Sequence, residues 1–216
     1  MKFRAVVFDM DGVLADSEPV FLEGVNAVIA AAGKEMTPEL HHEIMGTSVE
    51  DTWRILIDRL GLPGSMSDYV PAYDAEMRRR LAEVTAALPG ARELVAELRR
   101  RGVPIAVASS SWPAWIRALL GGIGLLGSFD AIASATEVEH PKPAPDLYLL
   151  AAERLGVEPR RCVAIEDTPT GLRSAKAAGM FAVQVRAAST AFPPLPEADA
   201  VIDTLADFDL ALLSPD

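Results

Sequence analysis

Cysteine is almost absent from this chain of 216 residues, because Cys162 is the only one. An intramolecular disulfide is therefore excluded, and we expect a protein of a reducing compartment, the cytoplasm. Cys162 opens the apolar segment 162–165, so we expect its thiol to pack in the core rather than to act as a nucleophile.

Long apolar runs are also missing, and none approaches the roughly 20 residues that a membrane-spanning helix needs. The first residues lead directly into an apolar segment, so we expect no secretion signal. Positive charge is in the minority: 20 Lys and Arg face 31 Asp and Glu, a formal net charge of −11. This balance argues against nucleic acid or a membrane as a partner. Because we find no heptad pattern and no apolar stripe, we expect a monomer.

Half of the residues are hydrophobic and 24% are charged, which is typical of a soluble globular chain. The segment 3–9 is typical of a short strand, and the segment 18–87 contains only helical patterns. The helices expected in the second segment are 19–32, 38–45, 49–60 and 67–86. The remainder is expected to hold strands 105–108, 129–133, 162–165, 181–185 and 200–202, and helices 91–101, 113–120, 145–155 and 169–178.

The alternation of strands and helices predicts an α/β fold, a Rossmann-like parallel sheet with helices on both faces. The helical block interrupts this pattern after the first strand and is predicted to be an inserted domain. We assign residues 1–16 and 88–216 to the Rossmann-like core and residues 17–87 to a helical cap. Such an insert begins and ends at the carboxyl edge of the sheet, where a cap excludes water and selects a substrate.

Two carboxylates and a glycine follow the first predicted strand directly. Asp9 and Asp11 come after the apolar segment 5–8, and Gly12 follows at once. Side chains alternate along a strand, so positions two apart leave it on the same side if the extended geometry continues. The carboxyl edge of an open α/β sheet is the usual place for a ligand. Two like charges there are costly unless a cation or a catalytic role offsets their repulsion.

Three later strands also end in polar residues. Ser109 and Ser110 stand before a helix that begins with proline, Lys142 lies in a proline-rich loop, and Glu166 and Asp167 follow an apolar strand. Lys142 is one of only four lysines. Taken singly, each feature has a structural explanation as a helix cap or a surface charge. Their occurrence at the strand ends of one predicted sheet favours a single site.

The residue types at these strand ends suit phosphoryl transfer. Asp9 and Asp167, with help from Glu166, form the oxygen-rich, low-coordination site that Mg²⁺ prefers. Lys142 and the Ser109 hydroxyl are placed to neutralise and hold a phosphoryl group, and this reaction requires mainly positioning and charge stabilisation. Asp9 is the candidate nucleophile, forming an aspartyl-phosphate, and Asp11 the candidate general acid and base.

The four motifs together resemble the haloacid dehalogenase-like superfamily, in the branch with an α-helical cap between the first and second motifs. The resemblance covers essentially the whole chain, and the segments 16–18 and 142–146 look most like its phosphatase and β-phosphoglucomutase-like group. It implies an enzyme that uses Mg²⁺ and a small phosphorylated substrate. The implied roles are catalysis by Asp9 and Asp11, metal binding by Asp9, Asp11, Asp167 and Glu166, and phosphate binding by Gly12, Ser109, Ser110 and Lys142.

The cap departs from the mutases of this group, which carry an arginine shortly after a Gly-x-Ser turn and a histidine on the first cap helix. Val49 and Phe21 occupy those positions here. We therefore favour hydrolysis of a small phosphorylated metabolite, such as a sugar phosphate, over a β-phosphoglucomutase-like reaction. The candidates for substrate selection in the cap are Phe21, Glu23, Gly46, Thr47, Ser48 and Val49.

A signalling role is the alternative from another class, because receiver domains also use an aspartyl-phosphate, Mg²⁺ and a lysine. A receiver needs no cap and has no acid two residues after its nucleophile. Asp11 and the helical insert therefore favour an enzyme over a phospho-acceptor or a binding protein.

Overall fold

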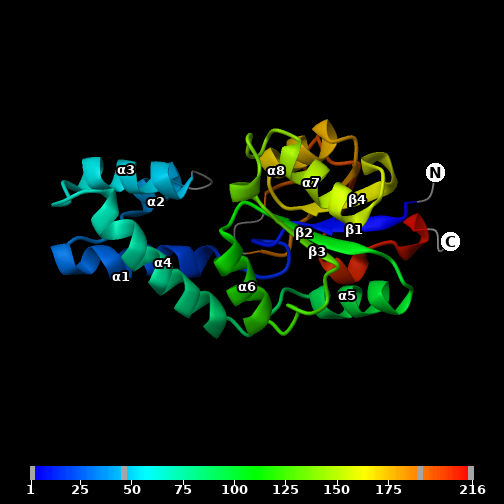
Figure 1. Ribbon diagram of the computed structural model, residues 1–216, viewed down its shortest axis with the longest axis horizontal. Coiled ribbons are helices and arrows are strands. Elements are labelled where there is room, and N and C mark those ends of the chain that lie inside the picture. The colour runs from blue at the N-terminus through cyan, green and yellow to red at the C-terminus, as the bar shows by residue number, and fades with distance from the viewer. Residues whose placement is uncertain (1–2, 45–47, 189–191, 214–216) are drawn as a thin grey trace. The chain divides into compact units, whose positions relative to one another are not determined.

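The computed structural model describes residues 3–44, 48–188 and 192–213 (Figure 1). The chain divides into two compact units, one formed by Met1–Asp16 with Val84–Asp216 and the other by Ser17–Glu83. Among the residues that the structure describes, no helix combines the length and the apolar character required to cross a membrane.

The first unit is built on a parallel sheet of six strands in the order β3-β2-β1-β4-β5-β6. The strands are β1 (Ala5–Phe8), β2 (Ile105–Ser109), β3 (Ala131–Ser134), β4 (Cys162–Glu166), β5 (Phe181–Val185) and β6 (Ala200–Ile202). The predicted α/β fold is confirmed. The strand order reverses beside β1, which is where open α/β sheets bind ligands.

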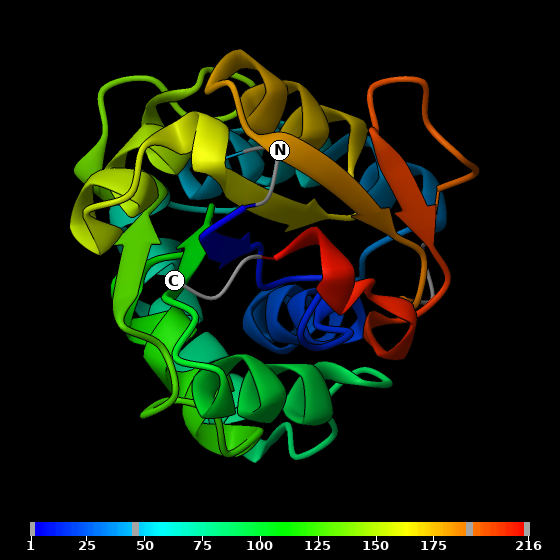
Figure 2. The same ribbon diagram turned by 90° about the vertical axis from the view of Figure 1, so that its right-hand side faces the viewer.

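Helices cover both faces of this sheet. In Figures 1 and 2, α7 (Asp146–Leu155) and α8 (Pro169–Ala177) lie on one face, and α5 (Ala91–Arg100) and α6 (Pro113–Gly122) on the other. Strands β1, β2 and β4 are buried along their whole length, as expected for central strands of a two-sided parallel sheet. Burial on both faces leaves only the strand ends for polar residues.

Several predicted boundaries differ from those observed by one to three residues, and two of these differences have a visible cause. Strand β3 begins at Ala131 rather than at residue 129. The Asp130 carboxylate accepts a hydrogen bond from the Ile105 amide at 2.9 Å, so Asp130 lies at the start of the pairing between β2 and β3. The helix predicted to reach residue 86 ends at Glu83. Beyond it, the Thr85 carbonyl accepts a hydrogen bond from Arg92 at 2.7 Å, so it does not continue the helix.

The second unit consists of helices only: α1 (Glu18–Ile29), a short 3₁₀ turn (Ala30–Ala32), α2 (Pro38–Ile44), α3 (Val49–Leu60) and α4 (Met66–Glu83). Helices α1 and α4 approach closely at Gly24, where an added Cβ would lie 2.5 Å from Sδ of Met77. The indole of Trp53 is fully buried, with its ring centroid 5.2 Å from Tyr69 and 5.4 Å from Tyr73. Trp53 is thus a core residue of this unit.

Candidate active site

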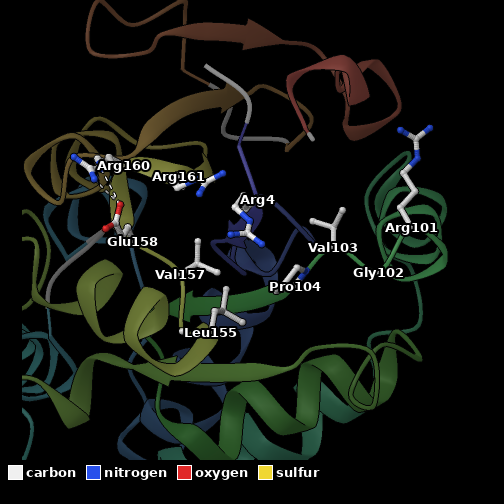
Figure 3. Close-up of a pocket in the computed structure, with 11 residues that line it drawn as sticks. Arg4, Arg101, Gly102, Val103, Pro104, Leu155, Val157, Glu158, Arg160 and Arg161 are labelled. Atoms are coloured by element: carbon white, nitrogen blue, oxygen red, sulfur yellow. Dashed lines mark hydrogen bonds and ion pairs between the residues drawn. The ribbon is translucent and has the colours of Figure 1, made fainter. Parts of the chain in front are cut away.

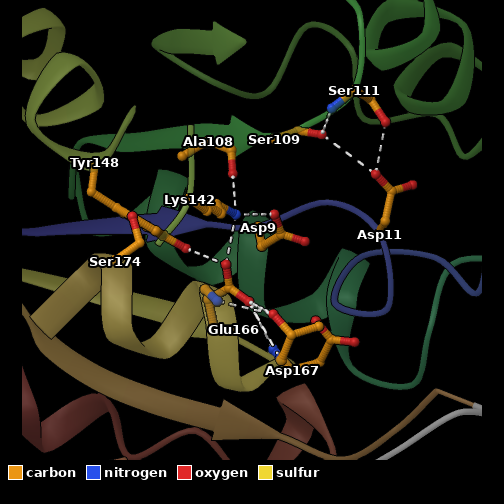
Figure 4. Close-up of polar contacts among 12 residues, drawn as sticks. Asp9, Asp11, Ala108, Ser109, Ser111, Lys142, Tyr148, Glu166, Asp167 and Ser174 are labelled. Atoms are coloured by element: carbon orange, nitrogen blue, oxygen red, sulfur yellow. Dashed lines mark hydrogen bonds and ion pairs between the residues drawn. The ribbon is translucent and has the colours of Figure 1, made fainter. Parts of the chain in front are cut away.

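The carboxyl ends of β1, β2 and β4 bring their polar residues together (Figure 4). Strands β1 and β4 are paired in register through Phe8 and Ile165, and the Asp9 amide donates to the Ile165 carbonyl at 2.9 Å. Asp9 therefore leaves the sheet beside Glu166, the last residue of β4. Backbone pairing alone thus places the first and fourth sequence motifs side by side.

Lys142 is buried at the centre of this group, with its side chain 7% exposed. Its Nζ lies 2.6 Å from Oδ1 of Asp9, 2.6 Å from Oε1 of Glu166 and 3.1 Å from the carbonyl oxygen of Ala108. These three acceptors match the three N–H donors of an ammonium group. Lys142 is therefore a fixed cation that spans the ends of β1, β2 and β4.

The carboxylates outnumber this cation. Burial raises the pKa of Asp9 to about 8, with the charges of Glu166 and Asp11 adding to the rise and Lys142 opposing it. Burial and the charges of Glu166 and Asp9 raise the pKa of Asp167 well above its usual range. Burial alone would lower the pKa of Lys142, but the charges of Asp9 and Glu166 outweigh that effect and raise it. The site as a whole favours a further positive charge.

Three of these carboxylates fit a hard cation. Ligand oxygens of Asp9, Glu166 and Asp167 lie within 4.8 Å of one another, and all three residues are buried. Oδ1 of Asp167 is buried without a hydrogen-bond partner. A buried carboxylate oxygen with no donor is costly, and a divalent cation would satisfy it. The donor set therefore suits Mg²⁺ better than a softer metal.

Glu166 differs from the other two carboxylates, because both its oxygens accept hydrogen bonds. Oε1 accepts from Lys142 and from the Tyr148 hydroxyl, the latter at 2.8 Å. Oε2 accepts from the Asp167 amide at 3.2 Å and from the amide and hydroxyl of Thr168 at 3.4 and 3.2 Å. This arrangement is suited to holding Lys142 in place, and it leaves Asp9 and Asp167 as the carboxylates most open to a metal.

Two glycines let the backbone come close to these carboxylates, Gly12 in the loop after β1 and Gly171 in α8. Gly12 has φ +78°, and an added Cβ there would lie 2.1 Å from Oδ2 of Asp167. A Cβ on Gly171 would lie 1.9 Å from the carboxylate of Glu166. Gly12 therefore brings the loop after β1 against Asp167.

Asp11 is held by hydroxyl groups at the end of β2. Its Oδ2 accepts from Ser111 at 3.0 Å and from Ser109 at 3.4 Å, and the Ser111 amide donates to Oγ of Ser109 at 3.0 Å. The Ser134 hydroxyl donates to the Ser111 carbonyl at 2.8 Å. The predicted Ser110 side chain is exposed.

Tyr148, Ser111 and Thr168 are site residues that the sequence reasoning did not select. Ser111 and Thr168 each stand next to a motif, in Ser109-Ser110-Ser111 and Glu166-Asp167-Thr168, which is the one signal that points to them. Tyr148 lies on α7, six residues after Lys142, and only the packing of that helix against the sheet brings its hydroxyl to Glu166.

The predicted residues of the helical unit have partners or positions inside that unit. Glu23 on α1 forms an ion pair with Arg80 on α4 at 2.6 Å. Ser48 caps α3, because its hydroxyl accepts from the Asp51 amide at 3.0 Å. Phe21 and Val49 are half-buried. Gly46 and Thr47 lie outside the described residues.

Comparison with known proteins gives consistent matches. The family model described as haloacid dehalogenase-like hydrolase matches residues 3–179. The phosphorylated carbohydrates phosphatase of Thermotoga maritima is 34% identical over 177 residues, 82% of this chain and 82% of that protein. The fructose-1-phosphate phosphatase YqaB of Escherichia coli is 35% identical over 190 residues, 86% of this chain and 97% of that protein.

A solved structure agrees with these relatives. A mutant of CbbY from Rhodobacter sphaeroides in complex with xylulose-(1,5)bisphosphate superposes with a TM-score of 0.86 at 31% identity, covering 98% of this chain and 99% of that one. The predictions of the family and of a phosphatase are confirmed by these matches. With its family model matched over 3–179 and two curated relatives above 30% identity, this chain belongs to the haloacid dehalogenase-like hydrolases.

Proposed function

We propose that this protein is a Mg²⁺-dependent phosphatase that hydrolyses a small phosphorylated metabolite of the sugar-phosphate class through an aspartyl-phosphate. The buried arrangement of Asp9, Lys142 and Asp167 at the carboxyl edge of the sheet is the observation on which the proposal rests. The sugar-phosphate class is supported by the names of the relatives from Thermotoga maritima and Escherichia coli.

The first half of the reaction uses Asp9 as the nucleophile. An oxygen of its carboxylate attacks phosphorus, the bond from phosphorus to the substrate oxygen breaks, and the phosphoryl group is transferred to Asp9. Lys142 neutralises phosphoryl charge, and Ser109 donates a hydrogen bond to a phosphoryl oxygen. Mg²⁺, held by the Asp9 and Asp167 carboxylates with the Asp11 carbonyl as the family pattern implies, would supply further positive charge to the transferred group.

Asp11 serves both halves of the reaction as general acid and base. It gives a proton to the departing substrate oxygen, and then accepts one from the water that attacks phosphorus and releases phosphate from Asp9. The Ser111 hydroxyl holds its carboxylate at a fixed place beside β2. A group that is fixed in this way need not be reorganised during the reaction.

We propose that the helical unit acts as a cap that excludes water and selects the alcohol part of the substrate. Its candidate residues remain Phe21, Glu23, Ser48 and Val49, together with the segment 46–47. Val49 stands where related mutases are expected to bind a second phosphate through an arginine, and this favours hydrolysis over mutase activity. We further propose a cytoplasmic monomer, in line with the single buried Cys162.

The test is an assay of phosphate release from a panel of phosphorylated metabolites with Mg²⁺ or EDTA, comparing the wild type with Asp9→Asn. The proposal predicts release that requires Mg²⁺ and is lost in the variant. The panel includes β-glucose 1-phosphate with its bisphosphate activator. Isomerisation to glucose 6-phosphate without net phosphate release would identify a mutase instead. The absence of both activities would contradict the proposal that the protein is an enzyme.

A further inference from the structure

A polar cavity lies at the opposite edge of the sheet from Asp9. Its volume is about 800 Å³, and it is lined by residues that precede β1, β2 and β4 and by the ends of α5 and α7 (Figure 3). Arg4 stands directly before β1, Pro104 before β2 and Arg161 before β4. None of these residues belongs to the site described above.

The charge of this cavity is opposite to that of the whole chain. Four arginines line it, Arg4, Arg101, Arg160 and Arg161, but only one carboxylate, Glu158, although the formal net charge of the protein is −11. Arg160 forms an ion pair with Glu158 at 2.8 Å. Arg101 is paired at 2.6 Å with Glu97, which is not a lining residue. Each of these two ion pairs offsets the charge of one arginine in the lining.

Arg161 adds a further positive charge to the cavity. Within residues 3–44, 48–188 and 192–213, no carboxylate forms an ion pair with its guanidinium group, and the residue is half-buried. Partial burial of a charged group costs free energy unless an opposite charge compensates it. An anion in the cavity would provide that compensation.

The backbone holds Arg161 beside Arg4. The Arg4 amide donates to the Arg161 carbonyl at 2.7 Å, and the next residues, Ala5 and Cys162, are paired in the sheet. In Figure 3 the side chains of Arg4 and Arg161 lie near one another in the cavity, above Val157 and Leu155. Guanidinium groups on adjacent strands can bind the oxygens of one head group, because each presents a rigid fork of donors.

The lining also includes four apolar side chains. Val103 and Pro104 border the cavity on the β2 side, and Leu155 and Val157 on the α7 side. Ligand sites of this size usually combine an apolar lining with a few polar groups that orient the ligand. A free inorganic anion would use the arginines and leave the apolar walls unused.

We propose that this cavity binds a small organic anion with a phosphate or sulfonate head and an apolar or planar body. The head is held by Arg161 and Arg4, and the body packs against Val103, Pro104 and Val157. At about 3.3 Å per residue, β1 places Arg4 roughly 17 Å from Asp9, so this ligand does not compete with a substrate for Lys142. The inference is independent of the proposed phosphatase function.

The test uses 1-naphthalenesulfonate, which has the required head and planar body and no phosphate ester to hydrolyse. Calorimetric titration of the full chain is expected to show one site with a Kd below about 1 mM. Arg161→Gln should weaken binding at least tenfold. Arg173→Gln is the matched control, because Arg173 lies on α8, forms an ion pair with Glu197 at 3.3 Å and does not line the cavity. It should leave the Kd within twofold of the wild-type value.

Amide shifts in two-dimensional NMR spectra locate the bound probe without relying on any variant. Shifts of Gly102 and Gly156, which line the cavity, are expected, whereas Gly12 and Gly171 at the carboxylate site should not move. Absence of binding up to about 10 mM, equal binding by Arg161→Gln, or shifts confined to Gly12 and Gly171 would each overturn the proposal.

Discussion

Lys142 and Tyr148 share one oxygen of Glu166: Oε1 accepts a hydrogen bond from Nζ of Lys142 at 2.6 Å and from the Tyr148 hydroxyl at 2.8 Å. The ammonium group also lies 5.1 Å from the centroid of the Tyr148 ring. Tyr148 is fully buried, so this hydroxyl fixes a carboxylate that in turn fixes the cation. The orientation of Lys142 thus depends on a residue that does not itself reach Asp9.

Removing this hydroxyl tests its contribution. Tyr148→Phe should lower kcat/KM for phosphate release about three- to tenfold and stability by about 1 kcal/mol, because one buried hydrogen bond is lost. Steady-state kinetics and chemical denaturation measure both effects. Tyr69→Phe is the matched control, since the Tyr69 hydroxyl donates to a carbonyl of the helical unit, and its kcat/KM should equal that of the wild type. Equal kcat/KM for Tyr148→Phe and the wild type would contradict this role.

Gly12→Ala should abolish most of the activity. The new Cβ would lie 2.1 Å from Oδ2 of Asp167, and φ +78° is strained for any residue with a side chain. Gly179 has φ +82° with open space around it, so Gly179→Ala bears the backbone strain alone, about 1 kcal/mol. The contradicting result is a Gly12→Ala enzyme with full activity and the same loss of stability as Gly179→Ala. It would show that the close approach of Gly12 to Asp167 is unimportant for activity.

Without metal, stability is expected to fall with rising pH because of Asp9. Its pKa rises from 3.8 to about 8 on folding, so the folded state binds more protons than the unfolded state between these values. The stabilisation is present below pH 4 and is lost as pH rises toward 8, with a slope of at most about 1.4 kcal/mol per pH unit.

Thermal melts in EDTA between pH 5 and pH 8 measure this slope. Asp9→Asn removes the titrating group and should give a flatter profile, and Mg²⁺ should restore wild-type stability most strongly at the higher pH. Parallel profiles for the two proteins in EDTA would show that Asp9 has no raised pKa.

Cys162 should be inert to thiol reagents in the folded protein. Burial raises the pKa of its thiol to about 12, so only about one molecule in ten thousand is a thiolate at pH 8. Iodoacetamide followed by mass spectrometry should label the denatured chain and leave the native chain unmodified. Rapid labelling of the native protein at pH 8 would place this thiol at an accessible surface.

Much of the fold follows from local sequence patterns. Helix α3 and strands β5 and β6 have the predicted bounds, because their apolar spacing and their flanking residues agree. Boundaries were missed where side chains from distant segments take part. Asp130 is one example, since its contact with Ile105 comes from the neighbouring strand.

The same distinction applies to the site. Asp9 and Glu166 are brought together by the pairing of β1 with β4, and the alternating pattern predicts the parallel sheet in which this pairing occurs. The hydrogen bonds from Ser111 to Asp11 and from Tyr148 to Glu166 depend on the exact packing of a loop and of a helix on the sheet. A single sequence has no periodic signal for such contacts, and so these two residues were found only in the structure.

The most direct test of the account is to trap the phosphoryl group on Asp9. Asp11→Asn removes the base that activates water, so an activated donor such as acetyl phosphate with Mg²⁺ should load this variant faster than hydrolysis unloads it. After acid quenching, peptide mass spectrometry should find one phosphoryl group on the peptide that contains Asp9. This group should be absent when EDTA is present, and absent from a variant that carries both Asp11→Asn and Asp9→Asn. A phosphoryl group on another residue, or hydrolysis at the wild-type rate by Asp9→Asn, would contradict the account.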